Sequence, residues 1–534
     1  MMSASREQRG LCGADFSSCF PTVRAAEGAT LRSDATSYGT EKIPAQDAEY
    51  KCAVPGAKST QSRRVLAEFI GTLLLTFSFG TSAQFSDVEF SGAAGALSLT
   101  GLTYTFAGVS GAHFNPAISL LLGLSGKMPW HEAISYIIAQ SLAAATSGSL
   151  LLLFGIYEPL GIVPDFPELN GIDLTAEVIF TTMLCLVHAG VLYTASNNPK
   201  GDQNHFFGFA VGLVPVAATY SVGPHHLMGL NPASSAALGL SGIRHNGLFW
   251  SSWRVMAQLG AAFIAAVVLA LCRPGEFGCP NLTLQNTNVP SAMIGPVFAE
   301  FTGTFFVVFA FCLGLVQHSL GTGLAVGAAY AALSYAFVDM SCHFSPAITL
   351  SVAFAGRRML GMRFAMVYVA AQFCAALAAG AVAGVLHRIG KFSWTNQGLR
   401  AYGSYTWWAV CAAEFIFALV VAWTALVVFT KRSRHKSSSW KFMQGIAVGS
   451  ALAVAEIATG GISGGIGSPA VAAGVAMEAL VCHLSPKQDV PPWTNVIWYV
   501  AMQLTGSCFG TLTFALIFPE EFMSGPLVAR GPDE

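Results

Sequence analysis

Charged side chains are scarce in this sequence. Asp, Glu, Lys and Arg make up 10% of the 534 residues, and hydrophobic residues make up 53%, whereas a soluble protein carries about 25% charged residues. Long apolar runs stand at 65–83, 259–272 and 415–429, and they approach or reach the roughly 20 residues that a helix needs to cross a bilayer. The composition therefore excludes an ordinary soluble protein and predicts a membrane protein.

The sequence also lacks the features of nucleic-acid-binding, disulfide-rich, metal-binding and catalytic proteins. The formal net charge is −1, so no excess of either sign points to nucleic acid or to an acidic partner. The 12 cysteines include no CxxC pair, which argues against a disulfide framework or a metal site. No nucleophile and base pair or cofactor motif is present. We therefore expect no enzyme activity, no catalytic residue, no cofactor and no bound metal.

The first 62 residues differ from the rest of the chain. They are polar and rich in Gly, Ser and Ala, and no apolar core of a cleaved signal stands near Met1,. We expect residues 1–62 to form a disordered cytosolic tail, and the first span to act as its own insertion signal.

A short pattern occurs four times, as HFNPAISL at 113–120, GLNPASSA at 229–236, HFSPAITL at 343–350 and GSPAVAAG at 467–474. The residues that lead its Pro-Ala pair are Asn115, Asn231, Ser345 and Ser468. Each copy follows a glutamate within an apolar run, and these glutamates are Glu68, Glu177, Glu300 and Glu414. The interval from glutamate to motif alternates between short and long. The order A-B-A-B indicates a half-chain unit that occurs twice, each unit being an internal duplication.

Each quarter of the chain contains two apolar spans, then the motif with a short apolar stretch, then one further span. An odd number of crossings inverts successive quarters. We therefore predict an all-α polytopic membrane protein of two tandem units, each with six transmembrane helices and two re-entrant half-helices, 12 spans in total. The predicted segments are a tail at 1–62, the first unit at 63–275, a cytosolic linker at 276–291, the second unit at 292–520 and a C-terminal tail at 521–534.

The motif itself predicts a half-helix that lines a pore. The apolar stretch after it, as at 115–127, is too short to cross the hydrocarbon and must return,. Asn or Ser followed by Pro suits a helix start, and we expect Ser to cap as well as Asn does. Irregular backbone at membrane depth is tolerated where it lines a cavity. Inverted quarters bring two helix N-termini together near the midplane, where their dipoles disfavour cations and the Asn amides offer N–H donors to a solute.

With these motifs the sequence resembles the aquaporin, or major intrinsic protein, family. The match rests on SGAHFNPA at 110–117 with a second NPA at 231–233, and it covers roughly 63–275 and 292–520. The resemblance implies passive transport of water or small uncharged solutes and usually four protomers, each with its own pore. It implies that the four glutamates brace the re-entrant loops, which agrees with the need of a buried carboxylate for hydrogen-bond donors. It places His113 and His343 at the inner vestibules.

Counting from the family's filter positions gives the selectivity filter of the first unit. Its residues are Gly95, Thr219, Met228 and Ser234. Ser234 stands where water-selective members carry Arg. This filter predicts a wider and less cationic constriction that favours larger neutral solutes and weakens selectivity for water alone. The candidate solutes are small and uncharged, such as glycerol, urea or ammonia. Alternatively, His225, His226 or Tyr220 refills the space.

The second unit departs further from the family. Its counted filter residues are Ala325, Glu456, Gly465 and Val471. A carboxylate within a span indicates a functional site, so Glu456 could bind a cation, hydrogen-bond a protonated solute or gate by protonation. Alternatively, it seals a silent pore by bonding the Gly-rich loop at 459–467. We expect Asp339 to be a solvated loop residue, and Cys342 to pack beside the pore with thiol-reagent block as the alternative.

Basic loops at 125–131, 356–363 and 430–441 predict the cytosolic face, and one basic loop at 387–400 disobeys the scheme,. Both termini are then cytosolic, in the plasma membrane or an internal membrane. The expected partners are water, small neutral solutes, the lipid bilayer and a second copy of the chain, so that two chains supply four units. An ion-coupled secondary transporter and a non-conducting membrane organiser are the competing interpretations.

Overall fold

In the computed structural model, the described residues are 59–85, 88–156, 170–198, 204–222, 229–277, 291–316, 321–355, 360–389, 398–430, 438–482 and 494–519. All of them belong to one compact unit, Tyr50–Glu534. The expected tails at 1–62 and 521–534 and the linker at 276–291 fall almost wholly outside these ranges. We call residues 59–277 the first repeat and residues 291–519 the second repeat.

The first repeat has six long helices and two short ones that follow its NPA motifs. The long helices are α1 (Gln61–Phe85), α2 (Val88–Ser110), α4 (Trp130–Leu153), α5 (Asn170–Leu192), α6 (Phe207–Val222) and α8 (Gly247–Cys272). The short ones are α3 (Pro116–Leu124) and α7 (Pro232–Ser241). A 3-10 turn at Ile243–His245 precedes α8, and α9 (Pro274–Phe277) follows it.

The second repeat has the same order of elements. Its long helices are α10 (Ser291–Val316), α11 (Thr322–Phe337), α13 (Met362–Ile389), α14 (Trp407–Thr430), α15 (Ser438–Ser463) and α17 (Thr494–Ile517). Its short ones are α12 (Pro346–Phe354) and α16 (Pro469–Cys482). The all-α fold with two tandem repeats is thus confirmed. Within the described residues, nine helices are long and apolar enough to cross a membrane, and α2, α6 and α11 are the other three expected crossings.

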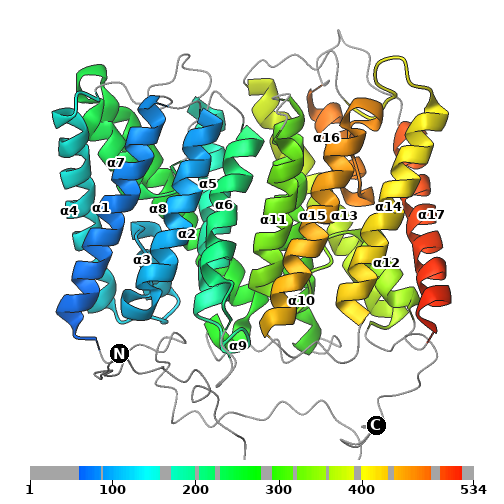
Figure 1. The fold of residues 1–534 in the computed structure, drawn as a ribbon, viewed down its shortest axis with the longest axis horizontal. Helices are drawn as coiled ribbons and strands as arrows, with labels where there is room; N and C mark the ends of the chain where they lie inside the picture. The colour runs from blue at the N-terminus through cyan, green and yellow to red at the C-terminus, as the bar shows by residue number, and fades with distance from the viewer. Residues whose placement is uncertain are drawn as a thin grey trace, which may run out of the picture. The chain divides into compact units, whose positions relative to one another are not determined.

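The short helices enter from opposite sides. Helices α3 and α12 lie on the side of α9, and α7 and α16 lie on the other side (Figure 1). Helix α3 has 9 residues, and at about 1.5 Å per residue it covers less than half of the hydrocarbon thickness of about 30 Å. Within each repeat, the two halves meet where α2 packs on α6 and where α11 packs on α15. Glycines permit the second contact, because a Cβ on Gly449 would lie 2.6 Å from the carbonyl oxygen of Gly327,.

The two repeats contact each other through α5 and α6 of the first and α10 and α11 of the second. Small residues allow a close approach, since a Cβ on Gly190 would lie 2.8 Å from the Cβ of Ala336. Tyr220 packs on Gly321 of the second repeat, so this residue faces the repeat junction. The alternative in which Tyr220 refills the first filter is therefore wrong.

An ion pair ties the end of the first repeat to the second. Arg273, just after α8, donates to both carboxyl oxygens of Asp339 at 2.8 and 2.6 Å and to the carbonyl oxygen of Ala336 at 2.8 Å. Burial alone would raise the pKa of the Asp339 carboxyl, but the Arg273 guanidinium holds this pKa below its ordinary value,. Asp339 is an exposed loop residue, as expected, but its carboxylate is paired and its side chain is 16% exposed. The pairing was not predicted, because Arg273 comes from a distant point in the sequence.

We predict that Arg273→Met lowers the thermal stability of the purified protein, because it removes the charged partner of the Asp339 carboxylate, at a cost of about 1–3 kcal/mol. The double variant with Asp339→Asn should recover most of the loss. Scanning fluorimetry of the melting temperature measures both. A double variant no more stable than the single one would contradict the assignment.

The pair of Arg64 and Glu132 is the matched control: its carboxylate is as exposed as that of Asp339, at 16%, but Arg64 is 29% exposed against 3% for Arg273. Arg64→Met should cost only about 1 kcal/mol or less. Because the folded pKa of Asp339 is lowered, the contribution of the Arg273 pair is present above the ordinary Asp pKa and is lost as pH falls through the folded value.

Candidate functional site: two cavities between re-entrant loops

The two NPA motifs of the first repeat hold each other. The side-chain oxygen of Asn115 accepts the Ala117 N–H at 2.9 Å, and its amide nitrogen donates to the Leu230 carbonyl oxygen at 2.9 Å. Asn231 makes the reciprocal bonds, from the Ala233 N–H at 2.9 Å and to the Phe114 carbonyl oxygen at 2.8 Å. An amide nitrogen carries two hydrogens, so each Asn retains one N–H beyond these bonds.

A left-handed residue precedes each motif. Phe114, Leu230 and Phe344 have φ of 49°, 48° and 49°, and Gly467 has φ of 59°. This conformation costs a non-glycine residue about 1–3 kcal/mol and persists only where its surroundings hold it. The backbone N–H of each of these four residues is bound by one of the predicted glutamates.

The bracing glutamates of the first repeat are fully buried. Glu68 accepts from Ser110 Oγ at 2.6 Å, the His113 N–H at 3.0 Å and the Phe114 N–H at 2.7 Å. Glu177 accepts from the Gly229 N–H at 2.8 Å and the Leu230 N–H at 3.0 Å. Each carboxyl therefore fixes the backbone just before its half-helix.

The second repeat repeats this bracing. Glu300 accepts from Ser341 Oγ and from the N–H groups of His343 and Phe344, both at 2.8 Å. Glu414 accepts from Ser463 Oγ at 2.6 Å and the Gly467 N–H at 3.2 Å. A glutamine completes every cluster, and sequence reasoning missed it. These residues are Gln140, Gln258, Gln372 and Gln503. Their signal was one glutamine in the apolar span after each motif.

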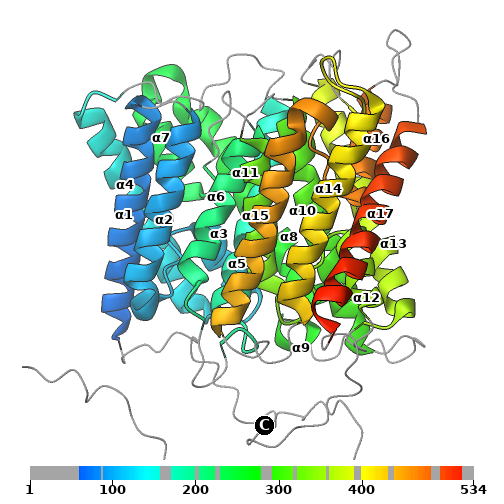
Figure 2. The ribbon, with the colours of Figure 1, turned by 45° about the vertical axis from the view of Figure 1, so that its right-hand side comes forward.

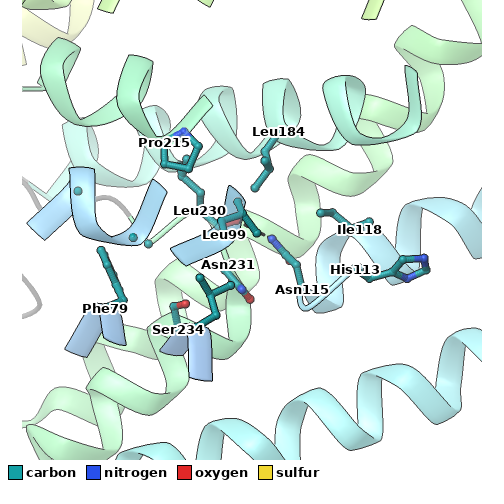
Figure 3. A pocket seen from close by; sticks show the side chains of 14 residues that line it. Phe79, Leu99, His113, Asn115, Ile118, Leu184, Pro215, Leu230, Asn231 and Ser234 are labelled. Carbon is teal, nitrogen blue, oxygen red and sulfur yellow. Dashed lines mark hydrogen bonds between the residues drawn. The ribbon is translucent and has the colours of Figure 1, made fainter. Parts of the chain in front are cut away.

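A cavity of about 480 Å³ lies between the two loops of the first repeat. Figure 3 shows Phe79 and His113 at its opposite ends, with Asn115 and Asn231 between them and Ser234 beside Asn231. Three glycines share the wall and add no side chain of their own, and these are Gly92, Gly95 and Gly229.

The structure places the counted filter residues of the first repeat unequally. Gly95 and Ser234 line the cavity, whereas Thr219 is buried and packs on Gly92. Met228 lies outside the described residues, as do His225 and His226. Phe79 was missed because nothing in the sequence sets it apart from other phenylalanines of its span. A Cβ on Gly95 would lie 3.0 Å from its ring, so Phe79 occupies part of the space that Gly95 leaves.

A second cavity of about 340 Å³ occupies the corresponding place in the second repeat. Ser345 and Ser468 line it, and their hydroxyl oxygens are 3.1 Å apart. Ser345 is the N-cap of α12, but its side chain makes no capping hydrogen bond. The expectation that Ser caps as well as Asn does is therefore wrong for Ser345, since its single hydroxyl bonds to Ser468 instead.

Of the counted filter residues of the second repeat, Glu456, Gly465 and Val471 line this cavity. Ala325 is buried, and its neighbour Val326 is the residue of α11 in the described lining. The count is thus off by one at this position.

The cause of this shift lies just before the motif. Ser341, which binds Glu300, stands two residues before His343, whereas Ser110, which binds Glu68, stands three before His113. The segment between span and motif is one residue shorter in the second repeat, so a count taken back from the motif reaches one residue too far.

The two motif histidines differ in their surroundings. His113 lines the first cavity and bonds to Tyr193 OH at 2.6 Å. His188, which sequence reasoning missed, has its ring centroid 5.6 Å from that of His113. His343 packs its ring on Phe429. Among the described residues, no group of His, Cys, Asp or Glu could hold a metal ion.

Cys342 is 1% exposed, and its sulfur accepts from Gln444 Nε2 at 2.9 Å. This burial favours the packing interpretation over block by thiol reagents.

We predict that Glu68→Gln destabilises the protein. One carboxylate oxygen that accepts hydrogen bonds from the loop is replaced by an NH2 group, which can only donate, so its former donors lose their acceptor. Each group left unsatisfied costs about 1–3 kcal/mol. Glu456→Gln is the control of identical chemistry, since Glu456 Oε2 has no hydrogen-bond partner in the described structure. Melting temperatures of the two variants should differ by several degrees. Equal losses would contradict the bracing role.

Comparison with known proteins agrees with this geometry. A family model described as "Major intrinsic protein" matches residues 56–272 and again 288–477. The chain is 31% identical to "Glycerol uptake facilitator protein-like 6" of Lactiplantibacillus plantarum over 39% of this chain and 98% of that protein. It is 31% identical to "Aquaporin Z" of Brucella melitensis over 37% of this chain and 94% of that protein. It is 29% identical to "Probable aquaporin NIP-type" of Nicotiana alata over 40% of this chain and 80% of that protein.

Each relative therefore spans about one repeat. The chain belongs to the major intrinsic protein family, whose members are membrane channels for water or small solutes and not enzymes, and it contains two domains of this family in tandem.

Proposed function

We propose that the first repeat conducts water and small uncharged solutes such as glycerol, urea or ammonia. The observation that carries this proposal is the first cavity, where Asn115 and Asn231 meet and each retains an amide N–H. A water molecule or a hydroxyl group can accept these hydrogen bonds in passing. The described lining contains no Asp, Glu, Lys or Arg, which argues against ion coupling through this cavity.

The small residues of the lining support passage of solutes larger than water. Gly92 and Gly95 add no side chain to the wall, and Ser234 places a small hydroxyl where water-selective relatives carry Arg. Phe79 limits the opening from the α1 side. The positive ends of α3 and α7 point toward the meeting point of the loops, and they oppose cations.

We predict that proteoliposomes with the wild-type protein show water, glycerol, urea or ammonia permeability above that of bare lipid in stopped-flow swelling, and that Gly95→Trp removes most of it because the indole fills the cavity. Leu142→Trp is the matched control, since Leu142 on α4 is 58% exposed and faces away from the core. Ser234→Arg tests the same wall with a second variant.

Wild-type permeability at the bare-lipid level for every solute would overturn the channel proposal and favour a membrane organiser. Uptake that saturates and follows an ion gradient would favour a secondary transporter. Equal effects of the two Trp variants would exclude the first cavity as the path.

We also propose that two chains close a ring of four repeats. Inside one chain, α5 and α6 pack on α10 and α11. The corresponding surfaces, on α1 and α2 of the first repeat and on α14 and α15 of the second, have no such partner within the described chain. They lie on the near side of the molecule in Figure 2.

Exposure at matched positions supports this ring. Tyr104 and Tyr335 occupy equivalent positions in the two repeats. Their hydroxyls donate to the backbone carbonyl oxygens of His205 and Phe442, which are also equivalent. Tyr335 is 0% exposed at the internal junction, whereas Tyr104 is 44% exposed. Seven residues earlier, Ala328 is 6% exposed and Leu97 is 74% exposed. The face that is buried in the second repeat is thus uncovered in the first.

The face of α15 shows the same contrast. Ala217 and Val454 stand equally far after His205 and Phe442. Ala217 is 0% exposed and Val454 is 48% exposed. A heterologous contact of this kind either closes into a ring or continues into a filament, and the four-protomer assembly that the family resemblance implies favours closure by a second copy.

We predict that Thr105→Cys combined with Val427→Cys yields a disulfide-linked dimer in membranes, because these positions correspond to Ala336 and Gly190, which approach closely inside the chain. The background should replace the exposed Cys374 and Cys508 with Ser. Thr105→Cys with Leu153→Cys is the control, as Leu153 is exposed on α4. A monomer on non-reducing gels, with a monomer mass in native mass spectrometry, would overturn the ring.

A further inference from the structure

Glu456 is unlike the other span glutamates described above. It lines the second cavity from α15, is 7% exposed, and its Oε2 has no hydrogen-bond partner among the described residues. Glu68, Glu177, Glu300 and Glu414 each accept several bonds from the loops that they brace. A buried carboxyl oxygen without a donor is costly. The interpretation that Glu456 seals the pore by bonding to the Gly-rich loop lacks the hydrogen bonds that it requires, and Glu414 holds that loop instead.

The backbone opposite Glu456 makes room for this side chain. Gly465 has φ of 71°, and a Cβ there would lie 2.7 Å from Glu456 Cγ. Only glycine meets both conditions at once. The counted counterparts in the first repeat are Thr219 and Met228. Thus the second repeat has Glu and Gly where the first has Thr and Met, and the glycine creates the space that the carboxyl occupies.

No donor group in the described lining serves this carboxyl. Helix α10 contributes Val307 and Phe311, and α11 contributes Val326. The re-entrant segments contribute Ser345 and Ser468, whose hydroxyls bond to each other, and the remaining described lining residues are glycines and apolar residues. Glu456 is the only titratable or charged side chain in that lining. The free oxygen of Glu456 is therefore able to accept hydrogen bonds from a ligand in the cavity.

The two cavities also differ in how strongly their charges oppose a cation. In each repeat two half-helix N-termini, worth about half a positive charge apiece, approach the cavity. No carboxyl lines the first cavity in the described residues, so its field opposes cations. In the second, a Glu456 carboxylate offsets the two helix ends. The second cavity therefore opposes a cation less than the first.

We propose that the second cavity binds a small primary ammonium ion, with Glu456 as its carboxylate ligand. The ammonium N–H groups supply the missing donors and the charge, and Ser345 and Ser468 offer further acceptor lone pairs. The apolar wall of Val307, Val326 and Leu452 suits a short alkyl substituent. Methylammonium has both features.

The test is equilibrium dialysis of the purified full-length protein against radiolabelled methylammonium. We expect saturable binding to the wild type and at least about tenfold weaker binding to Glu456→Gln, which keeps the shape and removes the charge. Tetramethylammonium, which has no N–H group, and neutral acetamide should compete poorly. Binding should weaken as pH falls, because protons compete for the same carboxyl. Val326→Phe, which fills the cavity from α11, should also abolish binding.

Water or glycerol permeability of the same preparations separates this proposal from the channel proposal. Normal permeability without saturable methylammonium binding, or with equal binding to Glu456→Gln, overturns the ammonium site and leaves the first repeat's function intact. Binding that is abolished by Gly95→Trp and unaffected by Val326→Phe also overturns it, because the ligand would then occupy the first cavity.

Discussion

The fold depends on four buried carboxyl groups that hold broken backbone at membrane depth. Lipid offers no hydrogen bonds, so a half-helix that stops near the midplane exposes N–H groups that the protein itself must bind. Glu68, Glu177, Glu300 and Glu414 take the N–H groups of the residues just before each half-helix. The same residues adopt left-handed conformations, which the carboxyl bonds hold in place. Each carboxyl in turn needs a glutamine from the span after the motif, so loop geometry and helix packing stabilise each other.

Much of this framework could be predicted from the sequence because it repeats. Four copies of one motif and four glutamates in alternating spacing specify two inverted duplications, and the short stretches after the motifs allow no full crossing. Contacts between segments that are distant in the sequence could not be predicted, because sequence patterns describe only neighbouring residues. Arg273 and Asp339 are 66 residues apart, and nothing local to either indicates the pair. Phe79 shares the first cavity with Gly95 from another helix, so a filter counted along single helices missed it.

Filter positions counted back from the motif are also wrong where the two repeats differ in length. The position of Val326 follows from where α11 packs on α15, whereas the count from the motif assumed equal spacing in both repeats. One residue fewer before His343 moves the prediction to Ala325. In the same way, the serines that replace the motif asparagines keep the half-helices but change their bonding. Asn115 and Asn231 each cap one helix and tie the opposite loop. Ser345 and Ser468 bond to each other, since one hydroxyl cannot reach both partners.

Fusion of two domains of this family allows them to diverge while the contact between them is preserved. The internal junction of α5 and α6 with α10 and α11, closed by the Arg273 pair, fixes one copy beside the other in every molecule. Neither cavity lies at that junction, because each is enclosed by helices of its own repeat. Substitutions in one cavity therefore need not disturb the contact between repeats. Thr219 and Met228 of the first repeat are replaced by Glu456 and Gly465 at the equivalent positions of the second. This change is confined to one cavity, because the added carboxyl and the space for it appear within the same repeat. An acidic cavity can thus arise beside a neutral one without altering the bracing carboxyls that hold both.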